Sequence, residues 1–177
     1  KNFIMNDGEI SGNEATAIVS GNGGGVCVKS GSFTMAGGRI SNNTTKAYGS
    51  RGGGGGVFVG HTAKFTMTAG EINGNTAPNG SGGGVFVSGN TTDEKGIFEM
   101  TGGTISGNTS KGSNSEGGDG VAVDYYAEFV MSGGAISQNG ATGSSSYGGG
   151  VYDNGTFTMS GDAMISGNTG KYGGVYV

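Results

Sequence analysis

An eleven-residue stretch that recurs six times constrains this chain more than any other feature. Two clear copies, at residues 33–43 and 98–108, read FTMAGGRISNN and FEMTGGTISGN. Each copy places Met two positions after Phe, Ile further along, and Asn three positions after the Ile. Repeats of roughly 24 to 36 residues are typical of solenoids, propellers and arrays. The fold must therefore stack copies of one short unit.

A second motif, Val-x-Val, separates the copies. It occurs at 26–28, 57–59, 85–87, 121–123 and 175–177, and residues 151–153 are a weaker copy. Both Phe-x-Met and Val-x-Val alternate with period two, which indicates short strands. Glycines on either side of the Ile favour tight turns.

These patterns predict one all-β domain over residues 1–177. We expect a single-stranded, right-handed parallel β-helix, or β-solenoid, of about six coils with three strands each. Its handedness follows the general rule for parallel crossovers. A helical fold is disfavoured by the glycine and β-branched content. A propeller is disfavoured because a blade needs about 40 residues or more.

The Asn column is predicted to form a structural ladder of side-chain amides along one turn, as in stacked cross-β structures. The residues directly before each Ile form another column, whose register predicts that Arg39 lies between Glu9 and Glu71 on neighbouring coils. The last copy has one extra residue before its Ile, which predicts a small bulge near Asp162. The Asn column consists of Asn13, Asn43, Asn75, Asn108, Asn139 and Asn168.

Composition excludes several classes of function. A net charge of −4 with 12% charged residues excludes a polybasic nucleic-acid module, so no nucleic-acid partner is expected. No apolar run has the length of a membrane-spanning segment. Cys27 is the only cysteine and His61 the only histidine, and neither has metal ligands at a suitable spacing. We therefore expect no cofactor and no metal.

The middle residues of Val-x-Val should point out of the coil, and several of them are aromatic. Exposed rings on a sheet are suited to binding sugars or proteins. Long loops could equally cover these rings, and the sequence leaves both interpretations open. The aromatic members of the column are Phe58, Phe86, Tyr152 and Tyr176.

The acidic residues are scattered, and no catalytic residue is predicted. Glycoside cleavage needs two carboxylates at a defined separation. Asp124 and Asp153 occupy nearby positions on adjacent coils and form the best candidate cluster for catalysis or metal binding. Solvated loop acids are the simpler interpretation. The glycine run at 52–56 lacks the Lys-Ser/Thr of a phosphate-binding loop and is interpreted as a flexible return into a strand.

Short Gly-Gly-x-Ile motifs stand at residues 37–40, 102–105 and 133–136. On these motifs, the chain resembles adhesin-like bacterial and archaeal surface proteins that are built from polymorphic outer-membrane-protein-like repeats. The resemblance covers nearly the whole chain. It implies an exported parallel β-helix that is part of a longer repeat protein on the cell surface.

Three functions are consistent with this architecture. The first is a non-catalytic extracellular scaffold or adhesin segment that displays variable loops to a host glycan, protein or cell. The second is a subunit of a filament in which identical chains stack head to tail, because both end coils would expose apolar edges. The third is a β-helix that binds or cleaves polysaccharide. Neighbouring repeats, of the same or an identical chain, are the expected partners.

Overall fold

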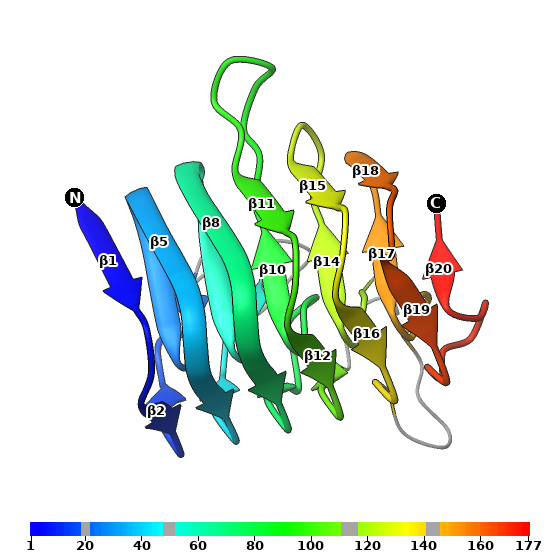
Figure 1. The fold of residues 1–177 in the computed structure, drawn as a ribbon, viewed down its shortest axis with the longest axis horizontal. Helices are drawn as coiled ribbons and strands as arrows, with labels where there is room; N and C mark the ends of the chain where they lie inside the picture. The colour runs from blue at the N-terminus through cyan, green and yellow to red at the C-terminus, as the bar shows by residue number, and fades with distance from the viewer. Residues whose placement is uncertain (19–21, 48–51, 111–116, 141–145) are drawn as a thin grey trace.

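The computed structural model describes residues 1–18, 22–47, 52–110, 117–140 and 146–177. Every strand pairing between its named elements is parallel, and these residues contain no helix. The strands stack along one axis, with the two termini at opposite ends (Figure 1). The predicted all-β parallel solenoid is therefore confirmed, with about five turns where about six coils were predicted.

The predicted strand types form the walls of the solenoid. The Val-x-Val segments lie in β10 (Val85–Val87), β14 (Val121–Val123), β17 (Val151–Asp153), β20 (Val175–Tyr176) and the first parts of β5 (Val26–Ser41) and β8 (Val57–Asn73). The Phe-x-Met segments lie in β1 (Asn2–Met5), β11 (Ile97–Met100), β15 (Glu128–Met131), β18 (Thr156–Met159) and the middle of β5 and β8. The Ile segments lie in β2 (Glu9–Ser11), β12 (Thr104–Ser106), β16 (Ala135–Ser137), β19 (Met164–Ser166) and the ends of β5 and β8.

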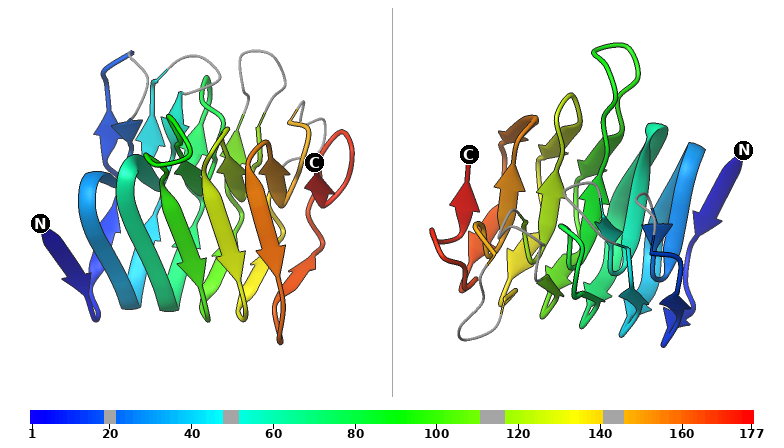
Figure 2. Two further views of the ribbon diagram at one scale, coloured as in Figure 1. Left: turned by 90° about the horizontal axis from the view of Figure 1, so that it is seen from above. Right: turned by 180° about the vertical axis from the view of Figure 1, so that it is seen from behind.

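The coil is right-handed. Followed from the N-terminus in Figure 1, the chain descends on the near side, rises behind and advances along the axis; the views in Figure 2 agree. This is the hand predicted from the general rule for parallel crossovers.

Two further sets of short strands were not predicted. The residues after the ladder Asn form a four-stranded sheet of β3 (Glu14–Ala15), β6 (Thr44–Thr45), β9 (Thr76–Ala77) and β13 (Thr109–Ser110). Two-residue strands β4 (Asn22–Gly23) and β7 (Gly53–Gly54) also pair. A prediction of three strands per coil was therefore incomplete, because two-residue strands carry no readable periodicity.

Equivalent residues of successive coils lie in register. Arg39 pairs with Glu9 on one side and with Glu71 on the other, as predicted. Its Nε lies 3.2 Å from Glu71 Oε2. The extra residue near Asp162 is accommodated in the turn between β18 and β19, so the strands themselves stay in register.

Phe, Met, Ile and Val side chains fill the interior. The Phe rings of neighbouring coils are stacked, with centroids 4.7 to 4.9 Å apart. This distance matches the separation of paired strands, about 4.8 Å. Phe33, Phe65, Phe98 and Phe129 are completely buried, as are the Met residues that follow them. The backbone spacing thus sets the ring stacking.

The Asn side chains form a continuous hydrogen-bonded ladder. In each of the first five, Nδ2 and the backbone N–H both donate to Oδ1 of the Asn on the next coil, at 2.9 to 3.0 Å. From the second Asn onward, Nδ2 also donates to an Ile carbonyl of the preceding coil, at 2.9 Å. Asn43, Asn75, Asn108 and Asn139 are completely buried, and this network satisfies their polar atoms.

Glycine is required where the coils approach most closely. Gly103, with a φ of +86°, lies against the Met67 side chain of the preceding coil. An added Cβ would stand 2.5 Å from the Met67 methyl group. Gly70 and Gly134 have the same conformation and the same kind of contact. The Gly-Gly-x-Ile motif therefore has a packing role beyond its turn.

Candidate functional site

The outward residues of the Val strands form a second, smaller apolar cluster outside the coil. Phe58, Phe86 and Tyr152 are 6%, 1% and 8% exposed, and Tyr176 is half-buried. Tyr147, which precedes β17, packs against this cluster. The sequence left open whether these rings are exposed for binding or covered by other residues. Phe58, Phe86 and Tyr152 are covered. A flat, open row of aromatic residues is not what the chain forms.

The tyrosines gather at the C-terminal end of this cluster. The Tyr152 and Tyr176 rings are stacked, with centroids 5.7 Å apart and planes 3° from parallel. Tyr147 is tilted against both rings, and its centroid lies 5.0 Å from that of Tyr176. Tyr172 makes an edge contact with Tyr147. These contacts hold the rings in fixed orientations.

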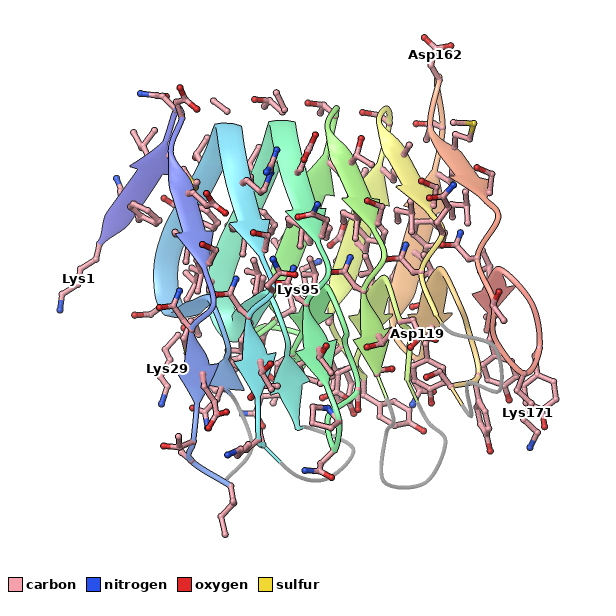
Figure 3. All side chains as sticks on the ribbon, turned by 90° about the horizontal axis from the view of Figure 1, so that it is seen from below. Lys1, Lys29, Lys95, Asp119, Asp162 and Lys171 are labelled. Carbon is pink, nitrogen blue, oxygen red and sulfur yellow. The ribbon has the colours of Figure 1, made fainter. Side chains whose placement is uncertain are left out.

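Lys171 extends this arrangement at the surface of the C-terminal end (Figure 3). Its Nζ lies 5.1 Å from the Tyr172 ring centroid and 5.4 Å from that of Tyr147. Both distances are within the range of cation–π attraction. A side-chain hydrogen bond with Tyr172 raises the pKa of Lys171, and attraction to the same phenol adds to the effect.

A groove of about 390 Å³ opens beside these rings. It runs across the outer side of β10, β14, β17 and β20, whose positions are shown in Figure 1. Its lining combines aromatic faces with hydroxyl, amide and carboxylate groups. We call it the tyrosine groove; it is lined by Ser81, Phe86, Val123, Asp124, Tyr125, Tyr147, Tyr152, Asn154, Tyr176 and Val177.

The structure places the two candidate acids differently. Asp124 lines the groove, and its Oδ1 accepts a hydrogen bond from Tyr125 N–H at 2.9 Å. Asp153 pairs with Val123 at an inward position of β17, where burial raises the pKa of its carboxyl group. Its Oδ1 accepts from Gly155 N–H at 3.0 Å. Each of these carboxylates therefore braces the turn that follows it.

A third acid, Asp119, is completely buried. Its Oδ1 accepts from Ser110 N–H at 2.5 Å and from the Ser146 hydroxyl at 3.2 Å. This network connects segments of two neighbouring coils. Within the described ranges, no three His, Cys, Asp or Glu side chains gather as metal ligands would.

Sequence reasoning missed most of the groove. It selected Phe86, Asp124, Tyr152 and Tyr176, but not the loop residues Tyr125 and Tyr147. One signal was available, because six of the seven tyrosines lie between residues 125 and 176. The positions of loop residues depend on how each loop folds back, and the repeat pattern does not specify this.

By its fold and its groove, this protein belongs to the class of all-β parallel solenoids, with an aromatic groove on its outer side. Within the part of the chain that the structure describes, no helix is long and apolar enough to cross a bilayer. Comparisons with models of protein families, with curated proteins and with solved structures found no match.

Proposed function

We propose that this chain is a non-catalytic scaffold segment of an extracellular surface protein, and that its tyrosine groove binds a glycan. The observation that carries the proposal is the groove itself, in which several aromatic rings and hydrogen-bonding groups converge. The resemblance of the Gly-Gly-x-Ile repeats to those of adhesin-like surface proteins supports the extracellular setting.

The chemistry of the groove suits a sugar. A pyranose offers apolar C–H faces and a rim of hydroxyl groups, so it matches a lining of mixed character. Tyr125 is 57% exposed and Tyr176 is half-buried, so both rings have faces or edges in reach of a ligand. Asp124 and Asn154 add a carboxylate and an amide to the lining. Ligand sites commonly combine an aromatic lining with a few polar groups.

Catalysis is less well supported than binding. Among the described residues that line the groove, Asp124 is the one carboxylate. Glycoside hydrolysis ordinarily uses two carboxyl groups that flank the scissile bond. The described lining of the groove thus has features for recognition and does not include the pair of carboxyl groups that hydrolysis ordinarily uses, so polysaccharide cleavage is the weaker alternative.

A glycan array followed by calorimetry tests this proposal. The informative variant is Tyr125→Asn, which removes an exposed ring from the groove. Its matched control is Tyr126→Asn, which removes the neighbouring ring, 52% exposed and outside the lining. Asn tolerates the φ of +62° at position 126. We expect at least a tenfold loss of affinity, about 1.4 kcal/mol, for Tyr125→Asn alone.

Two results would overturn the proposal. One is the absence of any glycan that binds the wild-type chain. The other is an equal loss of affinity in both variants, which would place the sugar outside the groove.

A further inference from the structure

The tyrosine groove contains a carboxylate that is largely shielded from water. Asp124 lines the groove but is only 7% exposed. Its backbone N–H donates to the Val87 carbonyl of the preceding coil at 2.9 Å, and its Oδ1 accepts from Tyr125 N–H at the same distance. These hydrogen bonds hold the carboxylate in place beside the aromatic rings.

The rings of the groove face in more than one direction. Tyr152 and Tyr176 lie within 3° of parallel, whereas Tyr147 is inclined by 57° to the first and by 56° to the second. The three rings therefore form a corner and not a single stack. Aromatic faces carry negative electrostatic potential. Rings that meet at an angle can surround a cation, as they do in the aromatic cages that bind ammonium groups.

Tyr147 already contacts an ammonium group of this chain. Lys171 Nζ lies 5.4 Å from its ring centroid, and Lys171 itself is exposed and lies outside the groove lining. Among the described residues that form the lining, none is Lys, Arg or His. Asp124 and the ring faces therefore give the groove a negative potential, while the exposed charge of Lys171 is screened by solvent.

We infer that the ligand of the tyrosine groove presents a protonated amine, so that the glycan is one built from amino sugars. This inference rests on the proposed function and specifies the chemical class of its ligand. The ammonium group would lie against the inclined rings and pair with Asp124, because a carboxylate shielded from water attracts a cation more strongly than an exposed one. The net charge of −4 favours the approach of such a ligand. A uronic acid would instead bring a second carboxylate towards Asp124, and like charges oppose binding.

Calorimetry with three related sugars tests the inference on the whole chain. The probes are the β-1,4-linked tetrasaccharides of glucosamine, N-acetylglucosamine and glucose, at a mildly acidic pH that keeps the amines protonated. Asp124→Asn removes the charge and keeps an oxygen that can accept from Tyr125 N–H. The matched control is Asp93→Asn, which changes the net charge equally at an exposed position outside the groove.

The glucosamine tetrasaccharide should bind at least about tenfold more tightly than the other two, because the neutral sugars cannot form a charged hydrogen bond with Asp124. Asp124→Asn should remove most of this preference, and Asp93→Asn should preserve it. Equal losses in the two variants would overturn the inference, because they would indicate general attraction of a polycation to an acidic protein.

Other outcomes separate this inference from the proposed function. If the three sugars bind equally, or if the groove selects a glycan without a free amine, and Tyr125→Asn still weakens binding, the inference is wrong and the proposed function stands. If no glycan binds the wild-type chain, both are wrong.

Discussion

Inward and outward side chains differ in how much the residue type changes from coil to coil. The comparison is between side chains inside the solenoid and those on the outer side of the Val strands. On the inner side, the Phe and Ile columns keep the same residue in every coil. On the outer side of the Val strands the residue changes repeatedly along the axis, and the members are Cys27, Phe58, Phe86, Ala122, Tyr152 and Tyr176.

This difference has a physical origin. An inward residue stacks on copies of itself, so its size and shape are fixed by the coils on either side. An outward residue meets loops whose lengths differ between coils, and it can also meet a ligand. Ala122 lies between Phe86 and Tyr152 in the outer column and leaves it without a continuous row of rings. The tyrosine groove spans these same coils. The inward columns of identical residues build the scaffold, and the variable outward column contributes residues to the tyrosine groove.

The largest effect is expected in the middle of the Asn ladder. Asn108→Ala removes the acceptor for the Asn75 backbone N–H and Nδ2, and leaves an Ile72 carbonyl without its donor. Each buried polar group left unsatisfied costs about 1–3 kcal/mol, so the free energy of unfolding should fall by about 3 kcal/mol or more. Denaturant unfolding measures this fall. Asn13→Ala, at the exposed end of the ladder, should cost about 1 kcal/mol. Equal losses of unfolding free energy in Asn108→Ala and Asn13→Ala would contradict this account, because they would show that burial within the ladder does not matter.

A smaller loss of stability is expected when Ala replaces glycines with positive φ. Two such glycines distinguish the cost of close packing between coils from the cost of the backbone conformation. Gly103→Ala must adopt positive φ and must also displace the Met67 methyl group, so we expect a loss of about 2–3 kcal/mol. Gly107→Ala requires positive φ, but the nearest atom to its added Cβ lies 3.8 Å away. That control should lose only about 1 kcal/mol. Comparable unfolding midpoints for the two variants would refute the packing role of the Gly-Gly-x-Ile motif.

The smallest effect concerns the coil in which an acid, Asp153, takes the place of an inward Val. Burial raises the pKa of Asp153 above its ordinary value of 3.8, so the folded chain holds this proton more tightly than the unfolded chain. Its contribution to stability is therefore greatest below about pH 3.8 and is lost as the pH rises through the folded-state pKa. Asp153→Asn should gain stability relative to wild type over that window. A difference in unfolding free energy that does not change with pH would contradict this assignment.

The repeat predicted the scaffold well because inward positions depend mainly on their own copies. The Phe column, the position of Arg39 and the location of the extra residue near Asp162 all follow from alignment of one copy with the next. The glycine run at 52–56 leads into β8, as its interpretation as a return into a strand predicted. The run is also buried and hydrogen-bonded to the adjacent coils, which the sequence did not indicate. A Cβ on Gly56 would approach the Asn75 amide and the Ile72 side chain, so glycine is required there.

The groove could not be predicted in the same way. Tyr125 follows β14 and Tyr147 lies in a Ser- and Gly-rich segment, and neither position has a counterpart that repeats in every coil. Their placement depends on loop conformation, which the column pattern leaves undetermined. Loops are commonly where binding residues stand, on a scaffold that holds them in position.

The central claim is that inner columns build the solenoid and the outer tyrosines bind. It is tested most directly by measuring glycan affinity and unfolding free energy together in Phe98→Leu and Tyr125→Asn. Phe98→Leu should lower the unfolding free energy by about 1–2 kcal/mol, because it opens space in a stacked core, and should leave glycan affinity unchanged. Tyr125→Asn should lower glycan affinity at least tenfold, with stability within about 0.5 kcal/mol of wild type. If affinity falls with core stability, or survives the loss of Tyr125, the division between scaffold and site is wrong.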